Sequence, residues 1–393
     1  MLISSEIKDS IETKFSKIAR DWNLRGGKIL SLGLGEPGFS TPQPIKDALY
    51  KAVHEGYTRY SSAQGLFELR ELISEQMNLD GNLNLLPDSI VITPGAKHAL
   101  SLVLMATLRP ADEVIIFTPC YPSYRSQILL AEPTAIIHEV ELNKHDFTID
   151  YLKLETLLKR NIKVVIFNFP HNPTGSVLSG NDVVCLEKLF LNQKCFVIAD
   201  EIYDKLNFFD KENISLSKID SIKESLITIN GFSKAYSMAG WRIGWLHGPK
   251  DVVSDVLKIH QHVNTHTCTF TQKAACACFK LDMDFLENYK KELSEKVIFL
   301  VDAISNYKCV SVCLPKGGLF AFVDISGTNK TSDDFASELL EKRCVAVTPG
   351  KVFGGMWDTH IRISLAAEIS EFKEAVNELG HYISNLEGKI KSN

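Results

Sequence analysis

The side chains best suited to chemistry stand close together between Asn230 and Trp245. This stretch reads NGFSKAYSMAGWRIGW and contains Lys234, the adjacent Ser233 and, eight residues after Lys234, Arg242. A lysine amine can form a Schiff base with an aldehyde, while a serine hydroxyl and an arginine guanidinium can both bind a phosphate. The spacing therefore favours a ligand that carries both groups, and pyridoxal phosphate (PLP) is such a ligand.

These side chains must be positioned by the elements around them. Between residues 89 and 247, seven short apolar runs alternate with segments, several of them long enough to form helices. This alternation predicts an α/β fold, with a mostly parallel seven-stranded sheet wrapped by helices; the last run, 242–247, is compatible with an antiparallel strand. Because ligands of such sheets bind at the carboxyl ends of the strands, we expect the polar residues at five of these ends to face one crevice.

The pattern changes after Pro249. Long helical patterns cover about 250–306, strands are expected at 310–314, 319–325 and 361–365, and a helix ends the chain. These helix and strand patterns predict a smaller α+β domain. We expect three parts: an N-terminal segment (1–45) that packs with the small domain, a large PLP-binding domain (46–285) and the small domain (286–393).

Composition excludes several classes of function. The 393 residues carry a net charge of −5 with scattered basic residues, which gives no electrostatic reason to bind nucleic acid or an anionic membrane. The N-terminus has no signal-peptide core, and no stretch approaches the ~18 apolar residues of a membrane span. Nine cysteines without zinc-like spacing favour free thiols in a reducing compartment, so we expect a cytoplasmic protein without a metal site.

Seven motifs occur in one order along most of the chain. They are GLGEPGFSTP, YTRYSSAQGLFELREL, TPGAKHAL, NFPHNPTG, ADEIY, GFSKAYSMAGWRIGW and IRIS, between about residues 33 and 365. In this order they resemble the class I/II aminotransferases, the fold type I PLP enzymes of the aspartate aminotransferase superfamily. The resemblance implies an enzyme that moves an amino group from an L-amino acid to a 2-oxo acid by a ping-pong mechanism.

The resemblance also assigns roles around the cofactor ring. Lys234 would carry the Schiff base and then shuttle protons, and Asp200 would keep the pyridine nitrogen protonated. Tyr203 and Asn172 would hydrogen-bond the phenolic oxygen, with a cis bond expected after Asn172. Tyr121 would stack on the ring.

The phosphate would lie at the start of a helix. There it would meet the backbone N–H groups of Gly95, Ala96 and Lys97, with Ser233 and Arg242 completing the cup from the other side.

Three further residues would complete the site by the same resemblance. Arg362 would clamp the substrate α-carboxylate, to which Gly35 would add a backbone group, and Asn172 would border the substrate. Tyr60 would reach the phosphate of the neighbouring subunit, which implies a homodimer with shared active sites. The family often has aspartate where this chain has Gly38, a change expected to loosen the segment over the substrate.

The sequence leaves the reaction and the substrate open. Similar residues serve PLP-dependent lyases, γ-eliminases, cyclases and oxidases, whose outcome depends on surrounding residues. A regulator of this fold would need an N-terminal DNA-binding domain, for which the motifs leave no room. A dicarboxylic substrate needs a distal cation, and apolar residues at the entrance would suit an aliphatic or aromatic side chain equally. The candidates are Arg20, Arg25, Arg59 and Arg125 for the cation, and Phe15, Leu34 and Phe39 for the apolar wall.

Overall fold

The fold is described by a computed structural model that covers residues 29–81, 85–209 and 214–390. Residues 1–28 of the predicted N-terminal segment lie outside this range. Among the described residues, every helix is either too short or too polar to cross a bilayer. All nine cysteines lie within the described residues and are free thiols.

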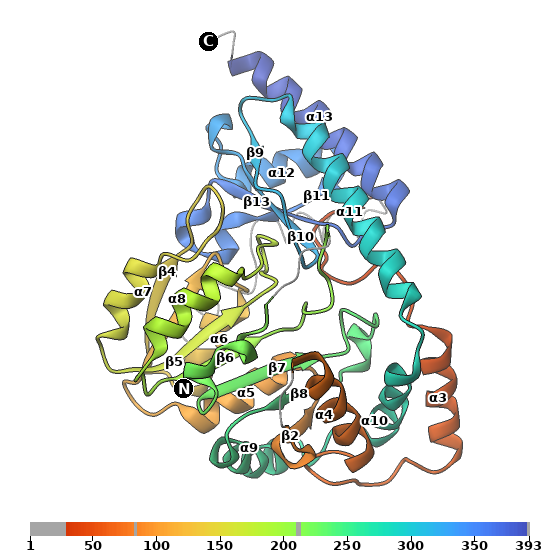
Figure 1. Ribbon diagram of the computed structural model, residues 1–393. Helices are drawn as coiled ribbons and strands as arrows, with labels where there is room; N and C mark the ends of the chain where they lie inside the picture. The colour runs from red at the N-terminus through yellow and green to blue at the C-terminus, as the bar shows by residue number, and fades with distance from the viewer. Residues whose placement is uncertain (1–28, 82–84, 210–213, 391–393) are drawn as a thin grey trace.

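A seven-stranded sheet forms the larger part of the molecule, as predicted (Figure 1). Its strands follow the order β2-β8-β7-β6-β5-β3-β4, and the neighbours from β7 to β4 are all parallel. The strand β8 is antiparallel to both β2 and β7, which confirms the expectation for the last apolar run. The bounds are β2 Ile90–Thr93, β3 Glu113–Thr118, β4 Ile136–Glu141, β5 Ile162–Asn168, β6 Phe196–Asp200, β7 Leu226–Gly231 and β8 Gly244–His247.

Helices cover both faces of this sheet because neighbouring strand residues point to opposite sides. Along β6, Ile198 packs on the face covered by α5 (Ala96–Thr107), α6 (Ser123–Ala131) and α9 (Lys250–Val263). Its neighbours Val197 and Ala199 pack on the other face, under α7 (Tyr151–Leu158) and α8 (Gly180–Phe190). Both faces are buried, which is why the strands read as continuous apolar runs.

A second set of elements lies together at the top of Figure 1. A four-stranded antiparallel sheet has the order β12-β13-β10-β9, next to the long helices α11 and α13 and the helix α12. This α+β arrangement agrees with the predicted fold class, while the boundaries at residues 45 and 285 stay predictions. The bounds are β9 Ser311–Val312, β10 Phe320–Asp324, β12 Thr348–Pro349, β13 His360–Ser364, α11 Asp284–Ser305, α12 Ser332–Arg343 and α13 Ile369–Ile390.

Two very short strands connect the start of the described chain to the small set of C-terminal elements. The strand β1 (Leu30–Ser31) pairs in parallel with β11 (Val345–Ala346), and Ser364 N–H donates to the Leu32 carbonyl at 2.7 Å. No sequence pattern indicates this pairing. It places the GLGEPGF segment beside β13, the strand that carries Arg362. The remaining helices are α3 Gln43–His54, α4 Phe67–Gly81 and α10 Thr269–Ala275.

Gly38 has a more specific role than the predicted loosening. An ideal Cβ on this residue would lie 2.2 Å from the Ala366 carbonyl oxygen, so only glycine allows the observed approach. The neighbouring Phe39 ring packs on Tyr289 of α11 with a centroid separation of 4.7 Å. The segment is therefore packed closely against the helix and the turn that follows β13.

Candidate active site

A cavity of about 190 Å³ lies at the carboxyl ends of the parallel strands. The sequence predicted a crevice at this edge of the sheet. The peptide bond between Asn172 and Pro173 beside it is cis, as expected. The predicted residues that line the cavity are Ala96, Lys97, Tyr121, Asn172, Asp200, Tyr203, Ser233, Lys234 and Arg242.

One end of the cavity brings together groups that attract an anion. The helix α5 begins at Ala96, and the preceding Gly95, with φ of 91°, has no side chain to cap the first N–H groups. A Cβ at Gly95 would lie 2.7 Å from Arg242 Nη2, so the glycine lets the guanidinium approach the helix start. Ser233 is buried at the same cavity. The Gly95 N–H, which was predicted to bind the phosphate, donates to the Thr93 carbonyl at 2.7 Å. A helix start without a side-chain cap, the helix dipole and a guanidinium together favour a phosphate dianion.

Lys234 reaches into the cavity from the segment after β7. Its Nζ donates to the Gly35 carbonyl at 2.7 Å and lies 5.9 Å from the centre of the Tyr203 ring. Burial lowers the pKa of the Lys234 amine to about 8, with the nearby Glu36 carboxylate opposing this shift and Arg362 adding to it. An amine with such a pKa is partly neutral near physiological pH, and therefore suits both a nucleophile and a base.

Asp200 ends β6 and faces the same cavity. The Tyr124 hydroxyl donates to Asp200 Oδ2 at 2.6 Å, and the Asn168 side chain donates to the Asp200 backbone carbonyl at 2.8 Å. Burial raises the pKa of the Asp200 carboxyl, against the stabilisation from Tyr124. A cationic partner in the cavity would restore the charged form.

Tyr124 and Asn168 also line the cavity, and neither was predicted from the sequence. Tyr124 lies in the first turn of α6, three residues after Tyr121. Asn168 ends β5, four residues before Asn172, whose backbone N–H donates to Asn168 Oδ1 at 3.0 Å. For Asn168 the available signal was a polar residue at the carboxyl end of a predicted strand.

Arg362 lies next to the cavity in β13. Its Nη1 donates to Asn172 Oδ1 at 3.0 Å and its Nη2 to the Gly33 carbonyl at 2.8 Å, while the Phe320 ring covers the guanidinium at 4.0 Å. Burial lowers its pKa to about 10, with Tyr203 opposing the shift. Arg362 therefore stays charged at neutral pH, and Asn172 connects it to the Asp200 side of the site.

Two further predicted residues, Gly35 and Tyr60, do not line the cavity. Gly35 lies in contact with the site through its carbonyl, which holds Lys234. Tyr60 is 85% exposed, and its ring packs edge-on against His266 at 5.4 Å, away from the cavity of its own chain.

Of the proposed distal cations, the two within the described residues, Arg59 and Arg125, do not line the cavity. Arg125 pairs with Glu139 at 2.6 Å, and Arg59 borders the separate hollow next to Tyr60. Arg20 and Arg25, like Phe15, lie outside the described residues. Of the apolar candidates, Leu34 is exposed, whereas Phe39 packs on α11.

The chain is similar to one known family over almost its whole length. The family described as aminotransferase class I and II matches residues 27–379. The chain belongs to this family. It is therefore an enzyme that transfers amino groups, as the sequence motifs predicted.

Individual relatives of this aminotransferase agree with that assignment. Aspartate aminotransferase of Bacillus sp. (strain YM-2) is 32% identical, over 93% of this chain and 94% of the relative. The structure of aspartate aminotransferase from Thermotoga maritima matches with a TM-score of 0.89 at 30% identity, covering 97% of this chain and all of that one. An aromatic aminotransferase from Pyrococcus horikoshii matches with a TM-score of 0.87 at 30% identity, covering 93% of this chain and 99% of that one.

Tyr124→Phe is expected to lower the kcat of this aminotransferase about tenfold, because a hydrogen bond to a charged group contributes about 1.5–3 kcal/mol. Steady-state kinetics across pH measure the effect. Tyr151→Phe is the matched control, since Tyr151 makes an equally short bond of 2.6 Å to Asp182 outside the site. Equal kcat values in the two variants would contradict a role for Tyr124.

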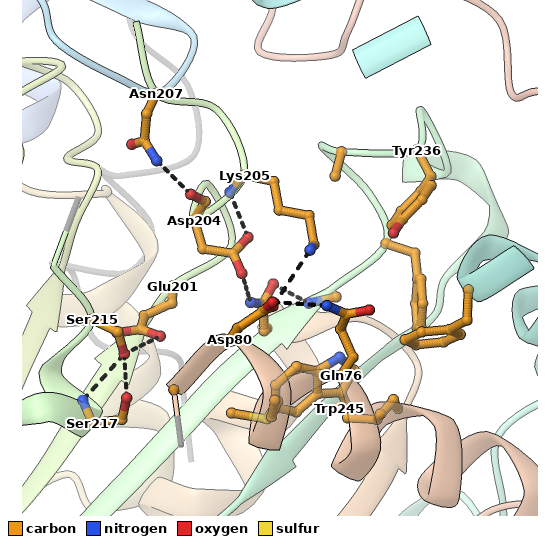
Figure 2. A pocket seen from close by; sticks show the side chains of 18 of the residues that line it. Gln76, Asp80, Glu201, Asp204, Lys205, Asn207, Ser215, Ser217, Tyr236 and Trp245 are labelled. Carbon is orange, nitrogen blue, oxygen red and sulfur yellow. Dashed lines mark hydrogen bonds and ion pairs between the residues drawn. The ribbon is translucent and has the colours of Figure 1, made fainter. Parts of the chain in front are cut away.

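A second cavity of the aminotransferase, of about 450 Å³, is lined in part by residues next to Lys234 in the sequence, namely Phe232, Ala235 and Tyr236. Figure 2 shows Glu201 and Asp204 among the side chains that line it, with Tyr236 on the opposite side. Glu201 follows Asp200 directly, but it faces the second cavity, where Ser215 Oγ donates to Glu201 Oε1 at 2.8 Å. Burial raises the pKa of Glu201 to about 7.

Glu201→Gln is expected to stabilise the aminotransferase at pH 8 but not at pH 5. The folded-state pKa of Glu201 lies above the unfolded value of about 4.5, so the folded protein holds a proton that the unfolded chain releases. The stability of the folded protein therefore falls as pH rises from about 4.5 to about 7, and a neutral glutamine escapes this loss of about 3 kcal/mol. Denaturant unfolding at both pH values measures the difference, and a gain that does not change with pH would contradict it.

Proposed function

We propose that this aminotransferase holds PLP in the cavity at the strand ends, with its phosphate on the start of α5 and its ring nitrogen at Asp200. The observation that carries this proposal is the position of Lys234 between an anion-binding end and a buried carboxylate. The residues fit the cofactor, because Gly95 leaves room for the Arg242 guanidinium beside uncapped N–H groups.

The residues of this chain would then share the work of the reaction. Bound PLP supplies an electron sink for the charge left when a bond at the substrate Cα breaks. Lys234 would anchor the cofactor covalently and move the proton at Cα, while Asp200 would hold a proton on the ring nitrogen. Tyr203 and Asn172 would bind the phenolic oxygen, and Tyr121 would cover the ring face.

Arg362 would bind the α-carboxylate of the amino acid. Its guanidinium is held beside Asn172, which lines the cavity, and the buried Nε donor has no partner among the described residues. Gly35 would add a backbone group from the opposite side. We propose L-aspartate as the first donor to examine, because several similar relatives are named aspartate aminotransferase.

We also propose a homodimer in which Tyr60 of one subunit reaches the phosphate of the other. Support comes from the 85% exposure of Tyr60 and its position beside a surface hollow of about 530 Å³. Nine free thiols support a cytoplasmic location. The division into a large domain (46–285) and a small domain (286–393), with 1–45 packed on the latter, is part of the same proposal.

Two measurements test the proposed function. The purified protein with added PLP should absorb near ~400–430 nm, and a protein without this absorbance would contradict the cofactor assignment. Mixing with L-aspartate and no acceptor should give stable pyridoxamine phosphate. Release of ammonia instead would favour a lyase. A panel of other amino acids in the same half-reaction identifies the donor.

A further inference from the structure

Lys296 in the middle of α11 is a fully buried lysine. None of its side chain is exposed to solvent, although a buried ammonium is costly unless it is well paired. Its amine has three N–H donors and three acceptors, which are the Leu365 carbonyl at 3.1 Å, the Ala367 carbonyl at 2.5 Å and the Glu292 carboxylate at 2.5 Å. Two backbone carbonyls thus take the place that solvent has around an ordinary lysine.

These two carbonyls belong to the turn that ends the strand of Arg362. Leu365 follows β13 directly, and its N–H donates to the Leu319 carbonyl at 2.9 Å. Between the two carbonyls stands Ala366, whose own carbonyl oxygen is the atom that Gly38 approaches. Lys296 thus holds one side of this turn while Gly38 packs on the other.

The segment containing Gly38 supplies acceptors to both cations of the site. The Gly33 carbonyl accepts from Arg362 at 2.8 Å, and the Gly35 carbonyl accepts from Lys234 at 2.7 Å. A shift of the turn by a few tenths of an ångström would move Gly38 and, with it, these two carbonyls. The contacts form one continuous path from α11 to the substrate side of the site.

We propose that Lys296 is a positioning residue for the amino-acid substrate. It fixes the Leu365–Ala367 turn, and through Gly38 it sets the Gly33–Phe39 segment beside Arg362. The proposal rests on the proposed function, since it concerns the binding of an amino acid next to Arg362. It also accounts for the glycine at position 38, because any Cβ there would push against the turn that Lys296 holds.

The test is Lys296→Met, which keeps the apolar stem and removes the charge. With PLP and 2-oxoglutarate present, KM for L-aspartate should rise at least tenfold, with kcat and PLP affinity each changing less than threefold. Lys296→Arg should recover most of the loss. Lys290→Met is the matched control, because Lys290 on the same helix pairs with Glu287 and does not touch the turn. An unchanged KM, or an equal rise in the control, would overturn the proposal.

A second readout does not depend on activity. Amide hydrogen exchange in the cofactor-free protein should become at least tenfold faster over residues 33–41 in Lys296→Met and stay unchanged in Lys290→Met; unchanged exchange would overturn the proposal. If Lys296→Met does not fold, Gly38→Ala tests the proposal in its place, because a Cβ at position 38 disturbs the same turn from the other side. This variant should raise KM for L-aspartate by the same factor, and an unchanged KM would overturn the proposal. If the unmodified enzyme does not turn over any amino acid, the proposed function fails, while hydrogen exchange still decides the role of Lys296.

Discussion

Lys234→Ala is expected to lower kcat by about 10⁴-fold or more, because one side chain would serve both as covalent anchor and as proton carrier. The burial that brings the pKa of this amine to about 8 prepares it for both tasks. The variant should also lose the absorbance near ~400–430 nm with added PLP. It should nevertheless still bind PLP, because the start of α5 and Arg242 are untouched.

Lys205→Ala is the control for this loss. Lys205 lies in the second cavity, 3.8 Å from Asp80, and belongs to the loop just after Tyr203. Its replacement should leave kcat and absorbance unchanged. Borohydride reduction followed by peptide mass analysis gives an independent answer, since the cofactor should be found on Lys234. Residual activity above about 1% in Lys234→Ala would contradict the assignment.

Asp200→Asn is expected to lower kcat by about 10³-fold or more, because it removes the charge of a preorganised, buried group at the reacting cofactor. The substitution preserves shape, and the amide oxygen of the new side chain can still accept the Tyr124 hydroxyl that now donates at 2.6 Å. The loss should therefore come from the charge and not from packing. Steady-state kinetics with L-aspartate, together with the affinity for PLP, measure it.

Asp204→Asn is the control for Asp200→Asn, because it also removes the charge of a buried carboxyl group but outside the cofactor cavity. Asp204 lies four residues after Asp200, in the segment that follows β6. Burial raises its carboxyl pKa as it does for Asp200, but Asp204 accepts from Asn230 in the second cavity. We expect kcat of Asp204→Asn to stay within threefold of the unmodified enzyme. If the two variants lose activity equally, Asp200 has no special role at the cofactor.

The sequence predicts the large sheet and most of the cavity because both depend on local patterns. Apolar runs buried on both faces are visible without any structure, and polar residues at their ends mark the crevice. Lys234, Asp200 and Asn172 could all be located in this way, and the structure places them around one cavity.

Contacts that join distant parts of the chain could not be predicted in the same way. Tyr124 and Asp200 are 76 residues apart, and neither carries a mark of the other in its own neighbourhood. The strands β1 and β11 have two residues each, too few to show a period. In the sequence Lys296 resembles any other helix lysine, because its acceptors include backbone carbonyls of another segment.

The pairing of Gly33 with Arg362 has a consequence for biosynthesis. These residues are 329 positions apart, so during translation the Gly33 carbonyl has no guanidinium partner until the ribosome has added Arg362. At translation rates of about 5–20 residues per second this takes roughly 16 to 66 s. The strands of the large sheet and Lys234 are all made before Arg362, so the substrate side can close only after Arg362 has been made. A nascent chain should therefore acquire the cofactor site before it acquires the ability to select an amino acid.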